Sequence, residues 1–444
     1  MLVCKFGGTS MANAETISKV AEIVNSDPDR RYVVVSAPGK RDASDTKVTD
    51  LLYQCFNDAV SKGSCHESFK LVREHFDAII KGLNLDLDFS EDYDEIEENI
   101  NKSTTADYAA SRGEYLSAKI LAAKLGYVFL DAARVVKFNE EGELQLHYSL
   151  DLFRNVMENI ERAVIPGFYG TKPSGEIKTF TRGGSDISGA IIARAAKADV
   201  YENWTDVDGF LRADPRIVQK PELIDCLTYR ELRELAYMGA NVLHPESIFP
   251  VRSVGIPINI RNTFNPDSKG TMIVAPNKRL DSKRIITGIA GQKGFTVILI
   301  EKAMMNSEVG FARKVMSVLE YENISFEHMP SGIDTLSIVI RDEQIQNKMQ
   351  KVVDKIRDAV NADNVEIHSG LSLIATVGHN MASRHGTAAT LFSALAKANI
   401  NVRMIDQGSS ELNIIVGVDT YDYEKAINAI YHAFMEAENG ISIY

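Results

Sequence analysis

The C-terminal part of the chain contains an internal repeat, which restricts the folds that this part can adopt. When it is aligned with itself at an offset of 76 residues without gaps, eleven positions carry the same amino acid. Self-similarity at one fixed offset indicates a supersecondary unit that is built twice. Each copy has the pattern of a strand, a turn, an amphipathic helix and two further strands, which predicts two small βαββαβ units. The identical pairs are Met305/Met381, Ser307/Ser383, Gly310/Gly386, Ala312/Ala388, Ser317/Ser393, Leu319/Leu395, Asn323/Asn399, Ile324/Ile400, Gly332/Gly408, Leu336/Leu412 and Ile338/Ile414.

The part before the repeat alternates between short β-rich runs and helix-like stretches, which predicts a mostly parallel sheet with helices on both faces. Ligands of such sheets bind at the carboxyl ends of the strands, where we expect Lys5 and Thr205. Residues 275–284, rich in Lys, Arg, Asp and Asn, are expected to form a linker. The clearest β-rich runs are Tyr32–Ser36, Tyr127–Leu130 and Val200–Trp204.

Composition excludes several classes of protein. The 444 residues are 45% hydrophobic, enough for two or three domains. The net charge of −12 argues against nucleic acid as a partner. No apolar segment approaches the length of a transmembrane helix, and the first strand begins too early for a signal peptide. The four cysteines show no paired spacing, so we expect reduced thiols and a cytoplasmic location.

Charge is concentrated between Asn84 and Ser103, where eight acidic residues and one lysine give a net charge of −7. This segment is either an acidic docking surface or a solvated helix or loop that caps a lobe. A solvated helix is the common explanation for such a run and is the interpretation we favour.

Two glycine-rich turns and one acidic turn indicate phosphate chemistry. The first turn follows an apolar run and precedes the amphipathic segment Ala14–Val24, so strand, turn and helix are predicted. Backbone N–H groups at a helix start can face an anion, and glycine lets the anion come close. The second turn spans Thr181–Asp186, and the acidic turn spans Trp204–Gly209. The first turn contains Lys5, Gly7, Gly8, Thr9 and Ser10.

Seven short motifs occur in the order that is typical of one family, and with them the chain resembles the monofunctional aspartate kinases over essentially its whole length. The resemblance implies an α/β amino-acid-kinase fold, with a mostly parallel sheet sandwiched by helices, over residues 1–280. Two α+β ferredoxin-like ACT domains are expected to follow at 285–366 and 367–444, with the terminal strand able to pair back into the first. The motifs are KFGGTS, SRGE (Ser111–Glu114), GFYG (Gly167–Gly170), TRGGSD, TDVDG, ADPR (Ala213–Arg216) and VLHP (Val242–Pro245).

The resemblance also implies a reaction, the ATP-dependent phosphorylation of the side-chain carboxylate of L-aspartate to 4-phospho-L-aspartate. In the family this is the first step of the pathway to lysine, threonine and methionine. A carboxylate is already ionised at pH 7, so no general base is needed. Cations and backbone dipoles must instead bring two anions together. Magnesium is expected to be held mainly by ATP oxygens and water, with no protein ligand.

Site residues are carried over from matching motif positions. Catalytic roles are expected for Lys5, which screens the transferring phosphoryl group, and for Asp186, which orients either Lys5 or the substrate ammonium. Arg182 is assigned to the substrate α-carboxylate and Glu114 to its α-ammonium. Thr49 and Ser185 are the other expected substrate contacts. The expected nucleotide contacts are Gly7, Gly8, Thr9, Ser10, Thr205, Asp206, Asp208, Asp214 and Arg216.

One position departs from the family pattern. Relatives commonly have Lys three residues before the His-Pro of the VLHP motif, where it approaches the ATP phosphates. This chain has Asn241 there, and a neutral amide cannot supply that charge. Arg216, Lys40 and Arg41 are alternative sources of the charge, between which the sequence does not decide.

The repeat suggests feedback inhibition, with L-lysine as effector and the first copy as its site. Glu327 in the first copy becomes Arg403 in the second, and Asp334 becomes Ser410, so an additional ammonium group is attracted to the first copy. Threonine, alone or with lysine, and a purely stabilising role for the tail are the alternatives. Open sheet edges predict a homodimer or a dimer of dimers through the ACT domains. By resemblance, the effector contacts are Met305, Ser307, Gly310, Phe311, Ala312, Ser325, Phe326 and Glu327.

Two rival functions remain open from sequence. Glutamate, acetylglutamate and nucleotide kinases share the glycine turns, but SRGE and the paired ACT copies disfavour them. A non-enzymatic amino-acid sensor would need only the tail, and the presence of Lys5, Arg182 and Asp186 disfavours it.

Overall fold

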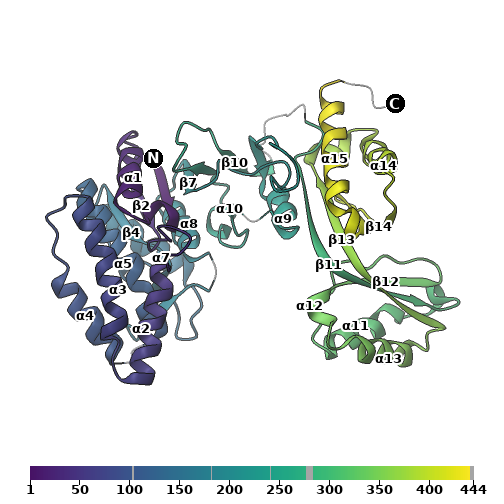
Figure 1. Cartoon of the computed structure of the whole chain (residues 1–444), viewed down its shortest axis with the longest axis horizontal. Coiled ribbons are helices and arrows are strands. Elements are labelled where there is room, and N and C mark those ends of the chain that lie inside the picture. The colour runs from purple at the N-terminus through teal and green to yellow at the C-terminus, as the bar shows by residue number, and fades with distance from the viewer. Residues whose placement is uncertain (103–104, 182, 241, 277–283, 441–444) are drawn as a thin grey trace. The chain divides into compact units, whose positions relative to one another are not determined.

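The computed structural model describes residues 1–102, 105–181, 183–240, 242–276 and 284–440 (Figure 1). The chain divides into two compact units. The first comprises Met1–Phe210, Leu223–Leu232 and Asn241–Leu280, and the second comprises Leu211–Glu222, Arg233–Ala240 and Asp281–Tyr444. The range 1–280 expected for the kinase domain therefore includes two segments that group with the second unit.

The described part of the first unit is built on an eight-stranded sheet. Its strands are β1 (Leu2–Phe6), β2 (Arg30–Val35), β3 (Val128–Phe129), β4 (Ala163–Pro166), β7 (Val200–Thr205), β8 (Cys226–Thr228), β9 (Ile258–Asn262) and β10 (Thr271–Val274). They are ordered β3-β4-β2-β1-β7-β9-β10-β8, and every pairing is parallel except β9 with β10. The mostly parallel sheet predicted from sequence is thus confirmed.

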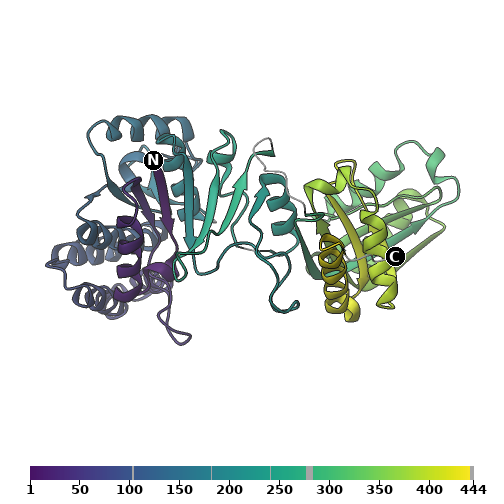
Figure 2. The same ribbon diagram turned by 90° about the horizontal axis from the view of Figure 1, so that it is seen from above.

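Helices cover both faces of this sheet. Alternate side chains of the central strands point to opposite faces, so Cys4, Phe6 and Trp204 join a core with helices α1–α5, while α8 contacts β1, β2 and β7 on the other face. Figure 2 shows the strands side by side, with the purple-to-blue helices α1–α5 gathered on one side. The helices are α1 (Ala14–Asn25), α2 (Val48–Lys62), α3 (His66–Gly82), α4 (Ser90–Asn101), α5 (Ala106–Leu125), α6 (Ala132–Val135), α7 (Leu146–Met157), α8 (Gly184–Ala195), α9 (Tyr229–Tyr237) and α10 (Phe249–Arg252); β5 (Tyr169–Thr171) and β6 (Ile177–Thr179) form a hairpin.

The glycine turn after β1 is confirmed as a strand-to-helix connection. It contains one short 3-10 segment, Gly8–Met11, and α1 then begins with a reciprocal cap between Asn13 and Thr16. Gly39 lies against the backbone of Gly8, because a Cβ atom at Gly39 would stand 2.8 Å from the Gly8 carbonyl carbon. Glycine is required there so that the turns after β1 and β2 can approach each other.

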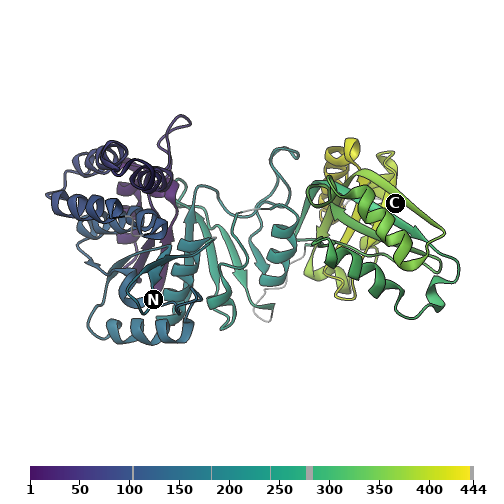
Figure 3. The ribbon, with the colours of Figure 1, turned by 90° about the horizontal axis from the view of Figure 1, so that it is seen from below.

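In its described part, the second unit is a five-stranded antiparallel sheet covered by two helix pairs. The strands are β11 (Gly288–Glu301), β12 (Thr335–Arg341), β13 (Asn364–Val377), β14 (Val402–Asp406) and β15 (Asn413–Asp419), ordered β12-β11-β13-β15-β14. Helices α11 (Phe311–Tyr321) and α13 (Met349–Val360) pack together, as do α14 (Thr387–Lys397) and α15 (Tyr423–Glu438) (Figures 1 and 3). A one-turn helix, α12 (Asp342–Ile345), follows β12.

The internal repeat is present in the structure. β13 begins and ends 76 residues after β11, and α14 begins and ends 76 residues after α11. The backbone repeats as well, since Gly310 and Gly386 have φ of 84° and 85° at the two helix starts. Both positions therefore require a residue that tolerates the left-handed region, which explains why glycine occurs in both copies.

The gapless alignment fails in the last strand of each copy. Leu336 pairs with Ile300 on β11, and the residue that pairs with the equivalent Thr376 on β13 is Ile414. Leu336 therefore corresponds to Ile414, at an offset of 78, and the second copy has two additional residues before this strand. The identities Leu336/Leu412 and Ile338/Ile414 are therefore two residues out of register.

The two copies share one continuous sheet, because β11 and β13 pair along their length. The expected boundary between residues 366 and 367 falls inside β13. Residues 441–444, the end of the second expected ACT domain, lie outside the described part of the chain, and the pairing of a terminal strand with the first copy stays a prediction. Within the described residues, no helix has the length and apolar character needed to span a membrane.

Candidate active site

Lys5 and Asp186 form an ion pair on the face of the sheet that α8 covers. Lys5 lies on β1, and Asp186 lies in the first turn of α8. The distance from Lys5 Nζ to Asp186 Oδ1 is 2.7 Å, and both side chains are largely buried. Lys5 is thus one of the two groups that Asp186 was expected to orient, the other being the substrate ammonium.

Two neighbouring residues of β7, which sequence reasoning missed, also reach Asp186. The Asn203 side-chain amide donates to Asp186 Oδ1 at 2.9 Å, and the Tyr201 hydroxyl donates to the Asp186 main-chain carbonyl at 3.1 Å. Asn203 is the direct register partner of Lys5 across β1 and β7. This adjacency links residues that are 198 positions apart, so no local pattern could have identified Asn203.

Glu114 supplies a buried carboxylate close to this ion pair. It lies on α5, where Gly113 lets the helix pack against Ala37, and Glu114 is 5% exposed. Burial raises the pKa of Glu114 to about 8, an effect partly offset by a hydrogen bond from the Ala37 backbone and by the charges of Arg112 and Lys5. Among the described residues, Oε2 of Glu114 has no hydrogen-bond partner. The site therefore holds a carboxyl group ready to ionise when a cation approaches.

The other expected substrate residues lie on the elements that surround Glu114 and Asp186. Thr49 is in the first turn of α2, next to Val48, which faces Gly113 on α5. Ser185 is buried at the start of α8, and a Cβ atom at Gly167 would stand 2.7 Å from the Ser185 Cβ. The glycine of the GFYG motif thus allows α8 to come close. Arg182 lies outside the described residues.

The first glycine turn and the acidic turn are hydrogen-bonded to each other. The Thr9 hydroxyl donates to Asp206 Oδ2 at 3.2 Å, and the Gly7 N–H donates to the Trp204 carbonyl at 3.0 Å. The Ser10 hydroxyl is fully buried against Thr263, with 2.8 Å between the two oxygens. Gly7 and Ser10 are therefore engaged within the protein and shape the turn, while Thr9 and Asp206 form its outer part.

The carboxylate of Asp208 is held by two asparagines that sequence reasoning did not select. Asn262 and Asn265 both donate to Asp208 Oδ1, at 2.9 and 3.0 Å. Thr205, at the end of β7, donates its hydroxyl to Asp206 Oδ1 at 3.2 Å. The acidic turn is thus fixed by contacts within the first unit.

Asp214 and Arg216 belong to the segment Leu211–Glu222, which groups with the second unit. They pair with each other at 2.6 Å, and the Arg216 side chain is exposed. These two residues thus belong to a different compact unit from Lys5, and their contact with the nucleotide stays a prediction. Asn241 lies outside the described residues, and Arg41, one proposed source of its missing charge, forms a two-point contact with Asp45.

The expected effector residues gather in the first copy of the repeat. Met305 and Phe311 are buried, Gly310 starts α11, and the Ser325 backbone N–H donates to Gln344 Oε1 at 2.8 Å. Ser307, Ser325 and Phe326 are exposed, and Ala312 is half-buried. Glu327 is half-buried, with its side chain 5% exposed, and it is hydrogen-bonded to Arg341 and to the Tyr237 hydroxyl. Its negative charge is therefore already compensated, which corrects the argument that Glu327 by itself attracts an additional ammonium group.

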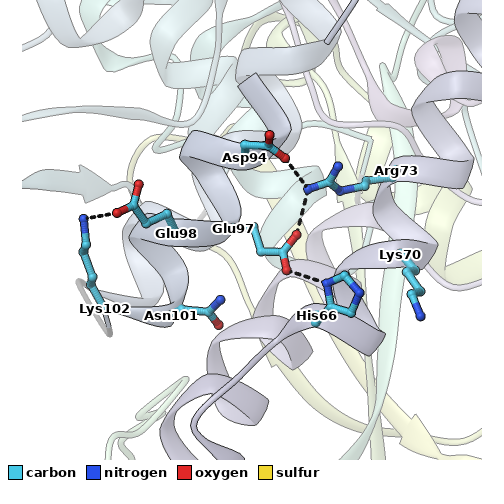
Figure 4. A pocket seen from close by; sticks show the side chains of 8 residues that line it. All are labelled: His66, Lys70, Arg73, Asp94, Glu97, Glu98, Asn101 and Lys102. Carbon is cyan, nitrogen blue, oxygen red and sulfur yellow. Dashed lines mark hydrogen bonds and ion pairs between the residues drawn. The ribbon is translucent and has the colours of Figure 1, made fainter. Parts of the chain in front are cut away.

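The acidic segment forms α4, and its carboxylates are paired with neighbouring helices. Arg73 on α3 contacts Asp94 and Glu97, and His66 contacts Glu97 at 2.8 Å, around a surface pocket between the two helices (Figure 4). Lys119 on α5 pairs with Asp92 at 2.6 Å. These contacts support the interpretation as a solvated helix that packs against the lobe. In the described part of the chain, no group of three or more His, Cys, Asp or Glu side chains is arranged to hold a metal ion.

Comparisons with known proteins agree with this arrangement. A model of the amino acid kinase family matches residues 1–262, and a model of an ACT domain matches residues 374–434. The chain is 39% identical to aspartokinase 3 of Bacillus subtilis, with 98% of both chains covered. It spans 51% of a bifunctional aspartokinase/homoserine dehydrogenase of Zea mays that it also matches.

Solved structures show the same likeness. A crystal structure of aspartate kinase from Clostridium acetobutylicum matches with a TM-score of 0.94 and 50% identity, covering 98% of this chain and 100% of that one. Aspartokinase III of E. coli, 25% identical and with the same coverage, matches with a TM-score of 0.73 in complex with aspartate and ADP and of 0.75 in complex with lysine and aspartate. With the family model covering more than half of the chain and a relative matching nearly all of it, the chain belongs to the aspartokinases of the amino acid kinase family and is a kinase.

Proposed function

We propose that this enzyme transfers the γ-phosphoryl group of ATP to the side-chain carboxylate of L-aspartate, which yields 4-phospho-L-aspartate and ADP. The observation that carries the proposal is the Lys5–Asp186 ion pair beside the buried carboxyl group of Glu114, whose Oε2 has no hydrogen-bond partner among the described residues. The E. coli relative, solved with aspartate and ADP, supports the same substrate and a nucleotide cosubstrate.

Lys5 and the start of α8 supply the positive potential that the reaction needs. The transfer brings an anionic carboxylate toward an anionic phosphate chain, so electrostatic stabilisation is the main requirement. The Lys5 ammonium stands at the first turn of α8, and the N-terminus of a helix of this length carries a partial positive charge. Both features favour a phosphoryl group near Asp186.

Glu114 gives the site its preference for an amino acid. A buried carboxyl group with one oxygen left without a partner is costly when charged, and an ammonium group reduces that cost. The α-ammonium of aspartate would therefore ionise Glu114 on binding, and a ligand without an amino group would leave it protonated. Thr49, Ser185 and Arg182 are proposed as the further substrate contacts, with Arg182 at the α-carboxylate.

The chemical step needs no proton transfer. An oxygen of the substrate carboxylate forms a bond to the γ-phosphorus, and the bond to the β-γ bridging oxygen breaks, so that ADP leaves with the electron pair. Magnesium would neutralise charge on the phosphates as the complex with ATP. We assign this ion no protein ligand.

Pathway and location follow from the same proposal. An acyl phosphate of aspartate is an activated acid, and we place the reaction at the start of the route to lysine, threonine and methionine. We propose a cytoplasmic location, which is supported by the four cysteines being free thiols, as is usual in a reducing compartment.

The decisive experiment measures ADP release by the purified protein with MgATP and either L-aspartate, L-glutamate or succinate. We expect turnover with aspartate and little with succinate, which lacks the amino group. Equal turnover with glutamate, or none with aspartate, would contradict the proposal.

We also propose inhibition by L-lysine through the first ACT copy. The E. coli relative was solved with lysine in its T-state, which supports lysine as the effector. The test measures kinase activity during titration with lysine, with threonine and with both together. Inhibition by threonine but not by lysine would show that lysine is not the effector. The proposed contacts remain those expected from the sequence.

An exposed apolar surface in the first copy supports assembly into a homodimer or a dimer of dimers. Met304, Val309 and Ile333 are 71%, 97% and 71% exposed. Their two loops are joined by hydrogen bonds from Met304 N–H to Asp334 and from Asn306 N–H to the Ile333 carbonyl. Light scattering of the wild type and of a Val309→Asp variant tests this assembly, and a wild-type monomer would refute it.

A further inference from the structure

We propose that Asn203 is a positioning residue for phosphoryl transfer, because its side-chain amide fixes the Asp186 carboxylate that orients Lys5. The inference rests on the proposed function of Lys5 and Asp186. None of the motifs that identify the family includes Asn203, and it lies one residue before the acidic turn.

The geometry brings two donors to one oxygen atom. Asp186 Oδ1 accepts from Lys5 Nζ at 2.7 Å and from Asn203 Nδ2 at 2.9 Å. Lys5 and Asn203 are register partners in adjacent parallel strands, so both side chains leave the sheet on the face that α8 covers. Asn203 is 4% exposed, and its amide is therefore shielded from competing water.

The backbone beneath Asp186 is fixed from the same strand. Tyr201, two residues before Asn203, donates its hydroxyl to the Asp186 carbonyl. A Cβ atom at Gly189 would overlap the Tyr201 ring, so a glycine on α8 permits this contact. Tyr201 thus anchors the helix and Asn203 anchors the carboxylate, which separates a structural role from a positioning role.

Asn203 keeps Asp186 satisfied while Lys5 changes partners. When the Lys5 ammonium turns toward a phosphoryl oxygen, a buried carboxylate that lost its only donor would pay a desolvation penalty. The Asn203 amide remains as a donor throughout. Because the amide is neutral, it does not offer the phosphate a second positive charge in place of that of Lys5. Asn203 thereby lowers the cost of moving Lys5 into the transition state.

Three titratable groups surround position 203, and they determine the effect of a charged replacement there. They are Lys5 on β1, Asp186 on α8 and Tyr201 on β7, and Glu114 on α5 interacts electrostatically with Lys5. A second carboxylate at position 203 would stand next to that of Asp186, and two carboxylates in contact share one proton until the pH is high.

The test compares Asn203→Leu and Asn203→Asp with Tyr201→Phe as the matched structural control. For Asn203→Leu we expect kcat to fall about tenfold or more, with smaller changes in KM, the scale of a lost hydrogen bond to a charged group. Asn203→Asp should retain activity at acidic pH, because a protonated carboxyl group donates as the amide does. Its kcat should then fall as the pH rises, relative to wild type.

Three results would overturn the inference. The first is a wild-type kcat in Asn203→Leu, and the second is a kcat–pH profile of Asn203→Asp that superimposes on that of the wild type. The third is a fall of kcat in Tyr201→Phe as large as that in Asn203→Leu, because Asn203 would then act only by anchoring α8.

A readout that does not depend on turnover separates this inference from the proposed function. The difference in thermal midpoint between Asn203→Asp and wild type should grow with pH as two adjacent buried carboxylates ionise. Suppose that the wild type has no activity with aspartate but that the difference in thermal midpoint increases with pH. The proposed function would then be wrong, while the contact between Asn203 and Asp186 would be supported. A difference independent of pH would refute the contact itself.

Discussion

Glu327 accepts a hydrogen bond from Arg341 at 2.8 Å in the first copy of the repeat, and the second copy holds the same two positions with the charges exchanged. Arg341 pairs with Phe295 on β11, and Asp419 pairs with the equivalent Leu371 on β13. Asp419 accepts from Arg403, the counterpart of Glu327, at 3.0 Å. The charge reversal seen in the sequence is therefore compensated within each copy, and in both copies the carboxylate is the less exposed partner of the pair.

This relationship predicts how Arg341 affects inhibition by lysine. Replacing Arg341 with Met leaves Glu327, which is 5% exposed at its side chain, without its cation. If Glu327 contacts the effector, an ammonium ligand then no longer competes with Arg341, and the lysine concentration for half-inhibition should fall several-fold. The matched control is Arg403→Met in the second copy, for which inhibition should not tighten. Equal effects of both substitutions would show that Glu327 is not the distinguishing residue.

Loss of Lys5 should remove most of the catalytic rate. In Lys5→Met the fold is expected to remain, because the side chain keeps its apolar part, while the charge aimed at the phosphoryl group is lost. We expect kcat to fall by several orders of magnitude with a smaller change in the KM for ATP. Lys62→Met, at an exposed lysine of α2, is the control and should retain activity. Near-normal turnover of folded Lys5→Met would refute the role of Lys5.

Glu114 should make the stability of the ligand-free enzyme fall as the pH rises. Its pKa of about 8 lies above the ordinary carboxyl value of 4.5, so between these pH values the folded enzyme holds a proton that the unfolded chain has released. The contribution of Glu114 to the unfolding free energy is fully present below the pKa of the carboxyl group in the unfolded chain. It is lost as the pH rises from there through 8, by roughly 1.4 kcal/mol per pH unit at most. The thermal midpoint of wild type relative to Glu114→Gln, measured from pH 5 to 9, should therefore decrease. A constant difference would show that Glu114 is ionised throughout.

The same carboxyl group predicts a pH dependence of aspartate binding. An ionised Glu114 is needed to hold the α-ammonium, so kcat/KM for aspartate should rise with pH and level off near 8. In Glu114→Gln the rise should disappear and the KM for aspartate should increase strongly. The KM for ATP serves as the internal control and should change little. A variant that lost ATP binding and kept aspartate binding would show that the subsites are reversed.

A buried ion pair in the second unit should be essential to its stability. The Arg212 side chain is 1% exposed, and its guanidinium donates to both carboxylate oxygens of Glu438 at 2.8 Å. Breaking a buried pair by removing one charge costs about 3–5 kcal/mol, so Glu438→Gln should lower the unfolding free energy of this unit by that order. Glu424→Gln, at an exposed pair on the same helix, is the control and should have little effect in denaturant unfolding.

The sequence by itself determined the features that depend on local periodicity. Alternating β-rich and helical runs predicted the parallel sheet, and the repeat predicted two equivalent strand–helix segments. Gly310 and Gly386 share a positive φ, a local backbone requirement that sequence identity preserves. The two residues inserted before β15 escaped a gapless comparison, since only strand pairing shows that Leu336 corresponds to Ile414.

Tertiary structure alone decided which distant residues meet. Lys5 and Asn203 are neighbours because β1 and β7 are adjacent in the sheet, and strand order is set by the packing of the whole domain. The compensation of Glu327 by Arg341 likewise depends on how β12 folds back beside the segment that contains Glu327. A local pattern records the period of one element and which face it buries, whereas the partner of a charged side chain is chosen by elements far away in sequence. The sequence therefore identified Lys5, Asp186 and Glu114 one by one, and the fold assembled them with Asn203 and Tyr201 into a site.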